Sequence, residues 1–390
     1  MEATKSRKYR IAVDGHVLLQ KEKTGVGQTA RYLINELAKN SSVVVQINFV
    51  DFFGYRCREF IKEYKRMGCR IRFCWWLPYS IYVKMFEKFK IPYYFLFGKK
   101  NDITLFFEYW VPYGIGTKTA NYVYDVNYRV YPETVEKSAL KWLNDTLPLY
   151  CERSDIIITI SNFSKKEIER YLGISDRRIQ VVPCGVDCDK YKKETSLEQS
   201  VSIRKKYGIE GKYILYMGTL EPRKNIAILI EAYHMLAERN RQLPKLVIVG
   251  KKGWMYERLY QMVTDFGLKD QIVFTGYIED DERVALMTAA ELFVFPSLYE
   301  GFGIPPLEAM ACGTPVIVSD AAALLETVGK NAMVFRSGDV TDLSCKIDVL
   351  LSDEVRRNIL RVSGRKWAEN YTWKRAGKQL VDALKQKTED

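Results

Sequence analysis

The sequence predicts an α/β protein built from two doubly wound parallel-sheet domains, and two observations support this. The chain has 390 residues, which is long for one domain and sufficient for two. Short apolar runs alternate with helical segments in the first half, and the alternation starts again near Tyr207. Because apolar strands that alternate with helices form parallel sheets with both faces covered, each series predicts one such domain.

The first series begins with the apolar run YRIAVDG, which predicts a buried strand. The sequence TGVG then predicts a loop, and QTARYLINELAKN predicts a helix. Within it Ala30, Leu33, Ile34 and Leu37 share one face. Five further strands are expected in SVVVQINFVDF, DITLFFEYW, NYVYDV, DIIITIS and RIQVVPCGVD. NFSKKEIERYLG begins with cap-type residues and ends on Gly173, so it predicts a helix.

The second series predicts five strands and the helices between them. The strands are expected in YILYMGTL, KLVIVG, QIVFTGYI, LFVFPS and TPVIVSD, and the first helix in NIAILIEAYHMLAER. The polar, lysine-rich residues 189–202 indicate the domain boundary. The tail TWKRAGKQLVDALKQ is an amphipathic helix by its pattern, with one apolar face of Trp373, Ala376, Leu380, Val381 and Leu384.

The composition narrows the class of protein. The formal net charge of +12 favours an anionic partner such as a nucleotide, a nucleic acid, a lipid headgroup or a polyphosphate. Eight cysteines without a C-x-x-C pair and only two histidines argue against zinc and for free thiols in a reducing cytoplasm. We expect neither a signal peptide nor a membrane-spanning helix.

Two glutamates flank a turn in PSLYEGFGIPPLEAMACGTPVIVSD. Glu300 lies in the loop after the strand LFVF, and Glu308 lies near the start of the next helix. Ligands bind beyond the carboxyl ends of the strands in such sheets, and a helix N-terminus attracts anions. Carboxylates accept hydrogen bonds from the hydroxyl groups of ribose or hexose. An ordinary capped helix with acidic residues is the alternative.

The segment YMGTLEPRKNI again joins a strand, a glycine loop and a helix. Arg223 and Lys224 lie where this loop meets the helix. A guanidinium group and an ammonium group at a helix N-terminus suit a diphosphate. Taken alone, an Arg-Lys pair is usually a solvated surface pair, which is the alternative here.

Together these segments resemble the retaining, nucleotide-sugar-dependent glycosyltransferases of family 4. YILYMGTLEPRKNI is similar to their donor-phosphate segment, and the second segment contains their Glu-x7-Glu motif. SNFSKKEI, VVPCGVD, LVIVGKKGW and VFTGYI also match in the family's order. The resemblance implies a GT-B fold of two Rossmann-like domains facing a cleft. Residues 1–190 would bind the acceptor, 191–371 would bind the donor, and 372–390 would pack back on the first domain.

The resemblance also implies roles for individual residues. Glu300 would orient the donor sugar, Arg223 and Lys224 would neutralise the diphosphate, and Asp125 completes the expected catalytic group. Glu308 would hold the ribose hydroxyls. The other expected donor-binding residues are Gly301, Phe302, Gly303, Ile304, Gly218, Thr219, Tyr277, Ile278, Gly25 and Gly27. No metal or other cofactor is expected, because Arg223, Lys224 and a helix dipole can stabilise the leaving group.

Some positions depart from the family's pattern. Thr219 stands where many members have arginine, Tyr124 stands where many have histidine, and Cys184 replaces the commoner asparagine of a turn. Asp187 and Asp189 resemble the metal-binding Asp-x-Asp of other glycosyltransferases, but we interpret them as the end of an interdomain turn. The two histidines, His16 and His234, are interpreted as structural residues.

The stretch from Gly54 to Lys100 combines positive charge with aromatic residues. It contains twelve Lys or Arg, three acidic residues and fourteen aromatics, a net charge of +9. The pattern suits a membrane interface or a nucleic-acid surface, and its location on the acceptor domain favours an anionic membrane. Tyr82, Met85, Phe86 and Phe89 are expected on one helical face. The alternative is that these aromatics belong to the core.

We therefore expect a hexosyltransferase that acts on a nucleotide sugar and a glycan acceptor, the latter lipid-linked, in surface polysaccharide biosynthesis. GDP-mannose is the expected donor, and a UDP-sugar or dTDP-rhamnose stays open. The expected location is cytoplasmic, at the inner face of the membrane. A nucleic-acid-binding protein and a catalytically silent GT-B scaffold are the alternatives from other classes.

Overall fold

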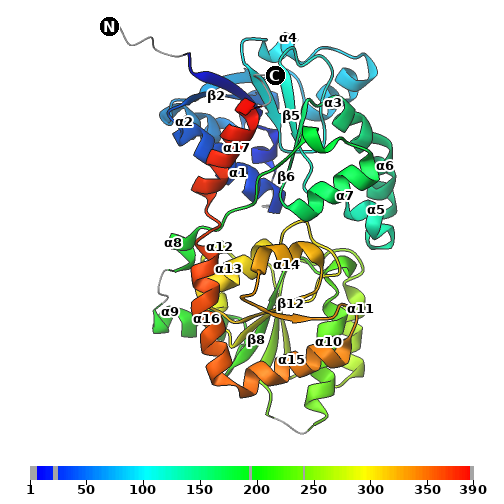
Figure 1. Ribbon diagram of the computed structural model, residues 1–390, viewed down its shortest axis with the longest axis vertical. Coiled ribbons are helices and arrows are strands. Elements are labelled where there is room, and N and C mark those ends of the chain that lie inside the picture. Colours follow the sequence, from blue (N-terminus) through cyan, green and yellow to red (C-terminus); the bar gives the residue numbers. More distant parts are fainter. Residues whose placement is uncertain (1–6, 21–24, 193–195, 240–241, 387–390) are drawn as a thin grey trace. The chain divides into compact units, whose positions relative to one another are not determined.

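The computed structural model describes residues 7–20, 25–192, 196–239 and 242–386, which form two parallel sheets with helices around them (Figure 1). Contacts divide the chain into two compact units. The first unit comprises the chain up to Val126, Ser138–Gly185 and the residues from Trp373 onward. The second unit comprises Asn127–Lys137 and Val186–Thr372. The expected domain limits, 190/191 and 371/372, stay a prediction.

The first unit contains a seven-stranded sheet in the order β3-β2-β1-β4-β5-β6-β7. Its strands are β1 Tyr9–Asp14, β2 Val43–Val50, β3 Arg70–Cys74, β4 Ile103–Phe106, β5 Lys118–Tyr122, β6 Ile156–Thr159 and β7 Ile179–Val181. All neighbouring strands are parallel. The strand order reverses between β1 and β4, so the sheet is doubly wound.

Helices cover the first sheet, and one of them begins earlier than expected. They are η1 His16–Leu19, α1 Gly25–Lys39, η2 Phe52–Gly54, α2 Arg58–Arg66, α3 Tyr79–Lys88, α4 Tyr94–Phe97, α6 Lys137–Glu152, α7 Asn162–Leu172, η4 Asp176–Arg178 and α17 Trp373–Gln386. The prediction of a loop at TGVG was wrong for its last three residues, because Gly25 and Gly27 belong to the first turn of α1. Thr24 lies outside the described residues.

The last helix, α17, packs against α1 within the first unit. The rings of Trp373 and Tyr32 stack with their centroids 4.6 Å apart. A Cβ atom added to Gly377 would lie 2.4 Å from the Cβ atom of Glu36, so the two helices approach closely at this glycine. The predicted apolar face of α17 is buried, and Leu380 is completely covered.

The second unit contains a six-stranded parallel sheet in the order β10-β9-β8-β11-β12-β13. Its strands are β8 Tyr213–Met217, β9 Lys245–Val249, β10 Ile272–Gly276, β11 Leu292–Phe295, β12 Val316–Ser319 and β13 Met333–Phe335. Its helices are α5 Asn127–Val130, η3 Pro132–Thr134, α8 Cys188–Tyr191, α9 Leu197–Lys206, η5 Pro222–Lys224, α10 Ile226–Ala237, α11 Glu257–Asp265, α12 Asp280–Thr288, α13 Ile304–Cys312, α14 Ala322–Val328, α15 Val340–Ser352 and α16 Glu354–Ala368. The order reverses between β8 and β11.

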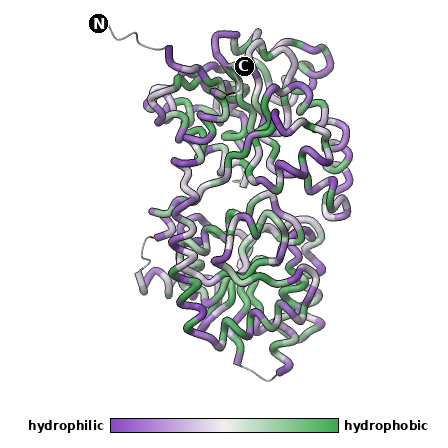
Figure 2. The backbone as a smooth tube through the Cα atoms, in the orientation of Figure 1, coloured by the Kyte–Doolittle hydropathy of each residue, from purple (hydrophilic) through white to green (hydrophobic). Residues whose placement is uncertain are grey.

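Burial explains why the strands could be predicted from apolar runs in the sequence. Figure 2 shows hydrophobic residues along the central strands of each unit and hydrophilic residues on the surrounding helices. All the residues of β8 and β11 are buried. Strands of parallel sheets are covered on both faces and therefore read as continuous apolar runs.

The four residues expected on one helical face at α3, Tyr82, Met85, Phe86 and Phe89, differ in burial. Tyr82 and Phe86 are buried in the core that α3 forms against the sheet, whereas Met85 and Phe89 are exposed. The helix therefore has one pair of apolar residues inside and another pair at the surface. Among the residues that the structure describes, no helix is both long and apolar enough to cross a bilayer.

The close approach at Gly377 generates a stability prediction with a matched control. Gly364 also lies inside a helix, α16, but a Cβ atom added there would lie 3.5 Å from Met310, an ordinary contact. Gly364→Ala should therefore stabilise the protein by about 0.5–1 kcal/mol through helix propensity. Gly377→Ala should be destabilising, because forcing a methyl group into a packed contact costs about 1–3 kcal/mol. Thermal unfolding of both variants measures the difference, and equal stabilisation by both would contradict the α1–α17 packing.

Candidate functional site

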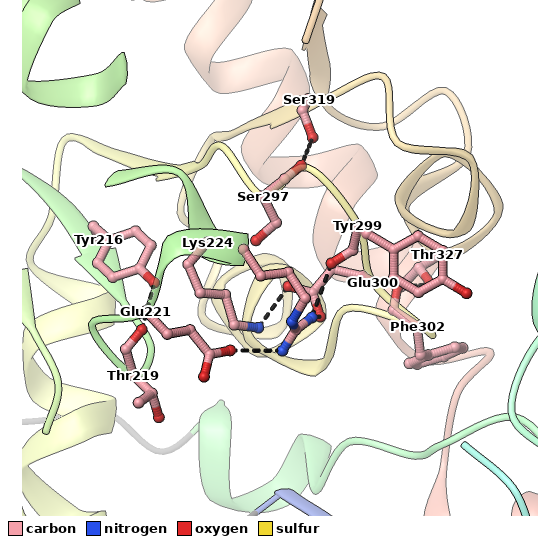
Figure 3. A network of polar contacts seen from close by, with 11 residues as sticks. Tyr216, Thr219, Glu221, Lys224, Ser297, Tyr299, Glu300, Phe302, Ser319 and Thr327 are labelled. Carbon is pink, nitrogen blue, oxygen red and sulfur yellow. Dashed lines mark hydrogen bonds and ion pairs between the residues drawn. The ribbon is translucent and has the colours of Figure 1, made fainter. Parts of the chain in front are cut away.

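The candidate site lies in the second unit, at the carboxyl ends of β8 and β11. These neighbouring strands are where the strand order reverses, the place at which open α/β sheets bind ligands. The loop after β8 contributes Arg223 and Lys224, and the loop after β11 contributes Glu300. Figure 3 shows the side chains of Lys224 and Glu300 pointing toward each other.

Glycine allows the loop after β8 to lie against the loop after β9. The amide of Gly218 donates to the carbonyl of Val249 at 2.9 Å, and the amide of Leu220 donates to the carbonyl of Lys251 at 2.9 Å. A Cβ atom added to Gly250 would lie 1.8 Å from the carbonyl oxygen of Gly218, so no other residue fits there without displacing the loop. The chain then makes the short turn η5 and enters α10 through Asn225 with φ of 50°.

Glu300 is held between two cations. Lys224 Nζ lies 2.5 Å from Glu300 Oε1, and Arg223 Nη1 lies 3.1 Å from Glu300 Oε2. The same guanidinium group donates to the carbonyl of Tyr299 at 2.8 Å and pairs with Glu221 at 2.8 Å. This network joins the two loops and fixes the side chains of all three charged residues.

The protonation states of the network follow from burial and charge. Burial alone would raise the pKa of Glu300, but the charges of Lys224 and Arg223 outweigh it and lower the pKa to about 2. Burial and the charge of Arg223 lower the pKa of Lys224, although the charge of Glu300 opposes this. Together with Glu221, the four side chains have no net formal charge.

The helix α13 begins directly after this network. Gly303, with φ of 108°, precedes it, and a Cβ atom added there would lie 2.5 Å from Leu324 Cδ2. Ile304 is the first residue of the helix, and Pro305 and Pro306, which follow it, have no N–H group. An anion at this N-terminus would therefore depend on the amides of residues 301–304.

Glu308 lies four residues into α13, and both of its carboxylate oxygens are engaged. The hydroxyl of Tyr191 donates to Oε1 at 2.5 Å, and the guanidinium group of Arg283 forms an ion pair with Oε2. The charge of Glu308 raises the pKa of Arg283 above its ordinary value. Sequence reasoning missed Tyr191 and Arg283, because neither belongs to a motif and only the packing of α8 and α12 brings them to Glu308.

The other expected donor-binding residues differ in exposure and location. Phe302 and Ile278 are buried, whereas the Tyr277 side chain is 56 % exposed. Gly218, Thr219 and Gly301 belong to the loops after β8 and β11, and Ile304 is the first residue of α13. Gly25, Gly27 and Asp125 belong to the first unit, and all the other predicted site residues belong to the second.

The acidic pair and the two histidines have local partners. Asp187 caps α8 by accepting from the Lys190 amide at 3.1 Å. His234 stacks on Phe266 with ring centroids 4.3 Å apart, and His16 stacks on Tyr79. Within the described ranges, no three His, Cys, Asp or Glu side chains gather in a group that could hold a metal ion.

Two family models match the chain. The model for "Glycosyl transferases group 1" matches residues 200–367, which include Arg223, Lys224, Glu300 and Glu308. The model for "Glycosyltransferase Family 4" matches residues 118–190. The matches thus cover most of the second unit and part of the first.

Curated relatives are similar over more than half of the chain. The O-antigen chain mannosyltransferase B of Escherichia coli is 33 % identical over 263 residues, which cover 67 % of this chain and 68 % of that protein. The serotype-specific mannosyltransferase WbdA of Escherichia coli is 34 % identical over 224 residues, or 57 % of this chain. The match covers only 28 % of that longer protein.

A solved structure supports the fold. The Anabaena protein Alr3699/HepE in complex with UDP-glucose superposes with a TM-score of 0.72 at 17 % identity, covering 97 % of this chain and 100 % of that one. The expected α/β GT-B fold is confirmed, as is the family to which the sequence motifs pointed. The chain belongs to glycosyltransferase family 4 and is a glycosyltransferase.

Proposed function

We propose that the protein transfers a hexose, mannose from GDP-mannose, to a lipid-linked glycan acceptor in surface polysaccharide synthesis, with retention at the anomeric carbon. The observation that carries the proposal is the buried group of Arg223, Lys224 and Glu300 at the strand switch point. The names of the two mannosyltransferase relatives support the choice of sugar. A UDP-sugar or dTDP-rhamnose donor is the alternative within the same reaction class.

The reaction needs positive charge beside the leaving group. Breaking the bond between the sugar and the diphosphate leaves an oxocarbenium-like centre and an anionic nucleoside diphosphate. Cations that are already in place stabilise this charge without reorganisation. Because Glu300 and Glu221 now neutralise Arg223 and Lys224, a bound diphosphate would compete with these carboxylates for the two cations. Glu300 would then be available to the donor sugar.

Glu308 suits the ribose of the donor. A carboxylate offers about four acceptor positions, and Tyr191 and Arg283 occupy one on each oxygen. The remaining positions can accept from two vicinal hydroxyls. Tyr191 and Arg283 are thereby positioning residues that hold the carboxylate in one orientation.

The first functional prediction concerns Lys224 and Glu308. Lys224→Ala should lower kcat by at least about a hundredfold, the usual cost of removing one preorganised charge-stabilising group. Glu308→Gln should chiefly raise the KM for the nucleotide sugar, because hydrogen bonds to a charged group contribute about 1.5–3 kcal/mol. Steady-state transfer of labelled mannose from GDP-mannose measures both effects.

Exposed residues of α16 provide matched controls. Lys366→Ala and Glu354→Ala remove the same charges from the surface of the same unit and should leave transfer unchanged. Thermal unfolding of all four variants separates loss of function from loss of fold. Wild-type turnover by folded Lys224→Ala and Glu308→Gln proteins would disprove the site assignment.

The second functional prediction concerns metal ions. We propose that Arg223 and Lys224 stabilise the leaving diphosphate without a metal. Transfer should therefore persist after dialysis against EDTA and should not increase when magnesium or manganese is added back. If chelation abolished transfer and manganese restored it, the result would contradict this proposal. It would instead indicate that Asp187 and Asp189 bind a metal ion.

We also propose that the stretch from Gly54 to Lys100 docks on an anionic membrane. Many of its aromatic side chains, and those just before it, are at the surface rather than in the core. The most exposed are Phe53, Tyr55, Trp75, Trp76, Phe89 and Phe95, each at least 56 % accessible. Lys84, Lys88 and Lys90 are exposed beside Phe89. Exposed aromatics beside lysines suit the headgroup region, where apolar rings insert and cations pair with anionic lipids.

Vesicle co-sedimentation tests the membrane proposal. Wild-type protein should bind vesicles that contain anionic lipid, and binding should weaken as salt rises, because each basic residue near the surface contributes about 1 kcal/mol. Changing Lys84, Lys88 and Lys90 together to Glu should release the protein. Trp75→Ser with Trp76→Ser should remove the binding that survives high salt.

A charge-matched triple variant is the control for the membrane test. Changing the exposed residues Lys269, Lys330 and Lys366 of the second unit to Glu alters net charge equally. This control should bind vesicles almost as well as the wild type. Equal loss of binding in both triple variants would show that only net charge matters, and no binding by the wild type would exclude this surface.

A further inference from the structure

Two carboxyl groups, those of Asp14 and Glu108, lie at the strand switch point of the first unit. β1 lies between β2 and β4 in the sheet, so the order reverses there. Asp14 is the last residue of β1, and Glu108 stands two residues after β4 ends at Phe106. Each side chain thus belongs to the sheet edge at which ligands bind in folds of this type. Neither residue belongs to the donor site in the second unit.

Both residues line one small cavity. Its volume is about 10 Å³, and its other lining residues are Val17, Tyr79, Phe106, Phe107 and Trp110. That volume is close to the minimum that holds a single water molecule. A hydroxyl group therefore fits inside, whereas a sugar ring has to remain outside with one hydroxyl inserted.

Neighbouring groups hold the two carboxyls in place. The amide of His16 donates to Asp14 Oδ1 at 3.0 Å, and the side-chain amide of Gln20 donates to Glu108 Oε1. The ring of His16 stacks on Tyr79, which lines the cavity. His16 itself does not line the cavity, and its Nδ1 atom is buried without a hydrogen-bond partner.

The pKa values of Asp14 and Glu108 favour a ligand that can both donate and accept hydrogen bonds, such as a hydroxyl group. Burial chiefly, and then the charge of Glu108, raise the pKa of Asp14 to about 7, although the His16 amide and the Tyr93 hydroxyl oppose this. Burial also raises the pKa of Glu108, against the hydrogen bond from Gln20. Near neutral pH the pair therefore holds a proton part of the time and can both donate and accept. A sugar hydroxyl has the same dual capacity.

Other ligand classes fit this cavity less well. An anion would be repelled by the carboxyl groups. A metal ion would need further ligands, and in the described part of the chain no third His, Cys, Asp or Glu joins the pair. The aromatic side chains of Tyr79 and Trp110 line the cavity beside the carboxyls and carry no positive charge that would attract an anion.

We propose that Asp14 and Glu108 bind a hydroxyl group of the acceptor glycan at the switch point of the first unit. The proposal rests on the glycosyl transfer proposed above and specifies part of the acceptor site. The first unit would recognise a neutral, hydroxyl-rich ligand through carboxyl groups. The second unit would recognise an anionic donor through Arg223 and Lys224.

Asp14→Asn and Glu108→Gln test the proposal, because both changes keep the shape of the side chain and remove its acid group. Methyl α-D-mannopyranoside serves as the probe. Its binding is measured by saturation-transfer NMR without donor, and its use as an acceptor is measured with GDP-mannose. Both variants should bind the mannoside more weakly and lose at least tenfold in kcat/KM for it. The increase in melting temperature caused by GDP should stay as in the wild type.

Glu63→Gln is the matched control, because Glu63 is on α2 in the same unit and forms an exposed ion pair with Arg31. This variant should bind and use the mannoside like the wild type. Equal mannoside binding by the wild type and the doubly substituted Asp14→Asn, Glu108→Gln protein would overturn the proposal. The proposal would also be overturned if the variants lost the GDP-induced increase in melting temperature to the same extent as mannoside binding. That result would indicate a structural role for the two carboxyl groups. Failure of GDP to stabilise the wild type would contradict the proposed donor instead, and the binding measurement would still decide this inference.

Discussion

The architecture of the candidate site in the second unit depends on one buried carboxylate, Glu300, held between Lys224 and Arg223. The residues come from loops 76 positions apart, so this contact fixes the loop after β8 against the loop after β11. Removing one member of a buried charge group typically costs about 3–5 kcal/mol, because the others stay buried without compensation. Arg223 also donates to the Tyr299 carbonyl, so the network holds the loop after β11 shortly before α13 begins at Ile304.

Glycines allow this contact to form. At Gly250 a side chain would collide with the backbone of the neighbouring loop, and at Gly303 it would collide with Leu324 in a left-handed backbone conformation. The glycines in VGKKG and EGFGIPP thus allow the backbone to approach and turn. Glu300 stands only three residues before Gly303, so one short motif contains both the glycine and the charged residue.

The sequence predicted those parts of the structure that local patterns determine. Buried parallel strands appear as apolar runs, and the face of α17 follows from helical spacing. Partners brought together by packing could not be predicted: Tyr191 and Arg283 reach Glu308 only through the arrangement of α8 and α12. In α3, helical spacing grouped four apolar residues, but Tyr82 with Phe86 and Met85 with Phe89 form two adjacent stripes. The boundary between core and solvent runs between these stripes, and only the sheet beneath α3 determines its position.

The two switch points show how carboxyl groups in similar places of the fold take different protonation states. Both sheets carry a carboxyl group at the place where the strand order reverses. The charges of Lys224 and Arg223 outweigh the effect of burial and hold the pKa of Glu300 at about 2. Glu300 is therefore an anion that holds these two cations in position. Among the described residues no cation beside Asp14 makes up for burial, and a second carboxyl raises the pKa of Asp14 further, to about 7. The first environment suits a phosphate that competes for fixed cations, and the second suits a hydroxyl that exchanges hydrogen bonds. The neighbours of each carboxyl group, rather than the group itself, therefore determine which ligand each sheet can take.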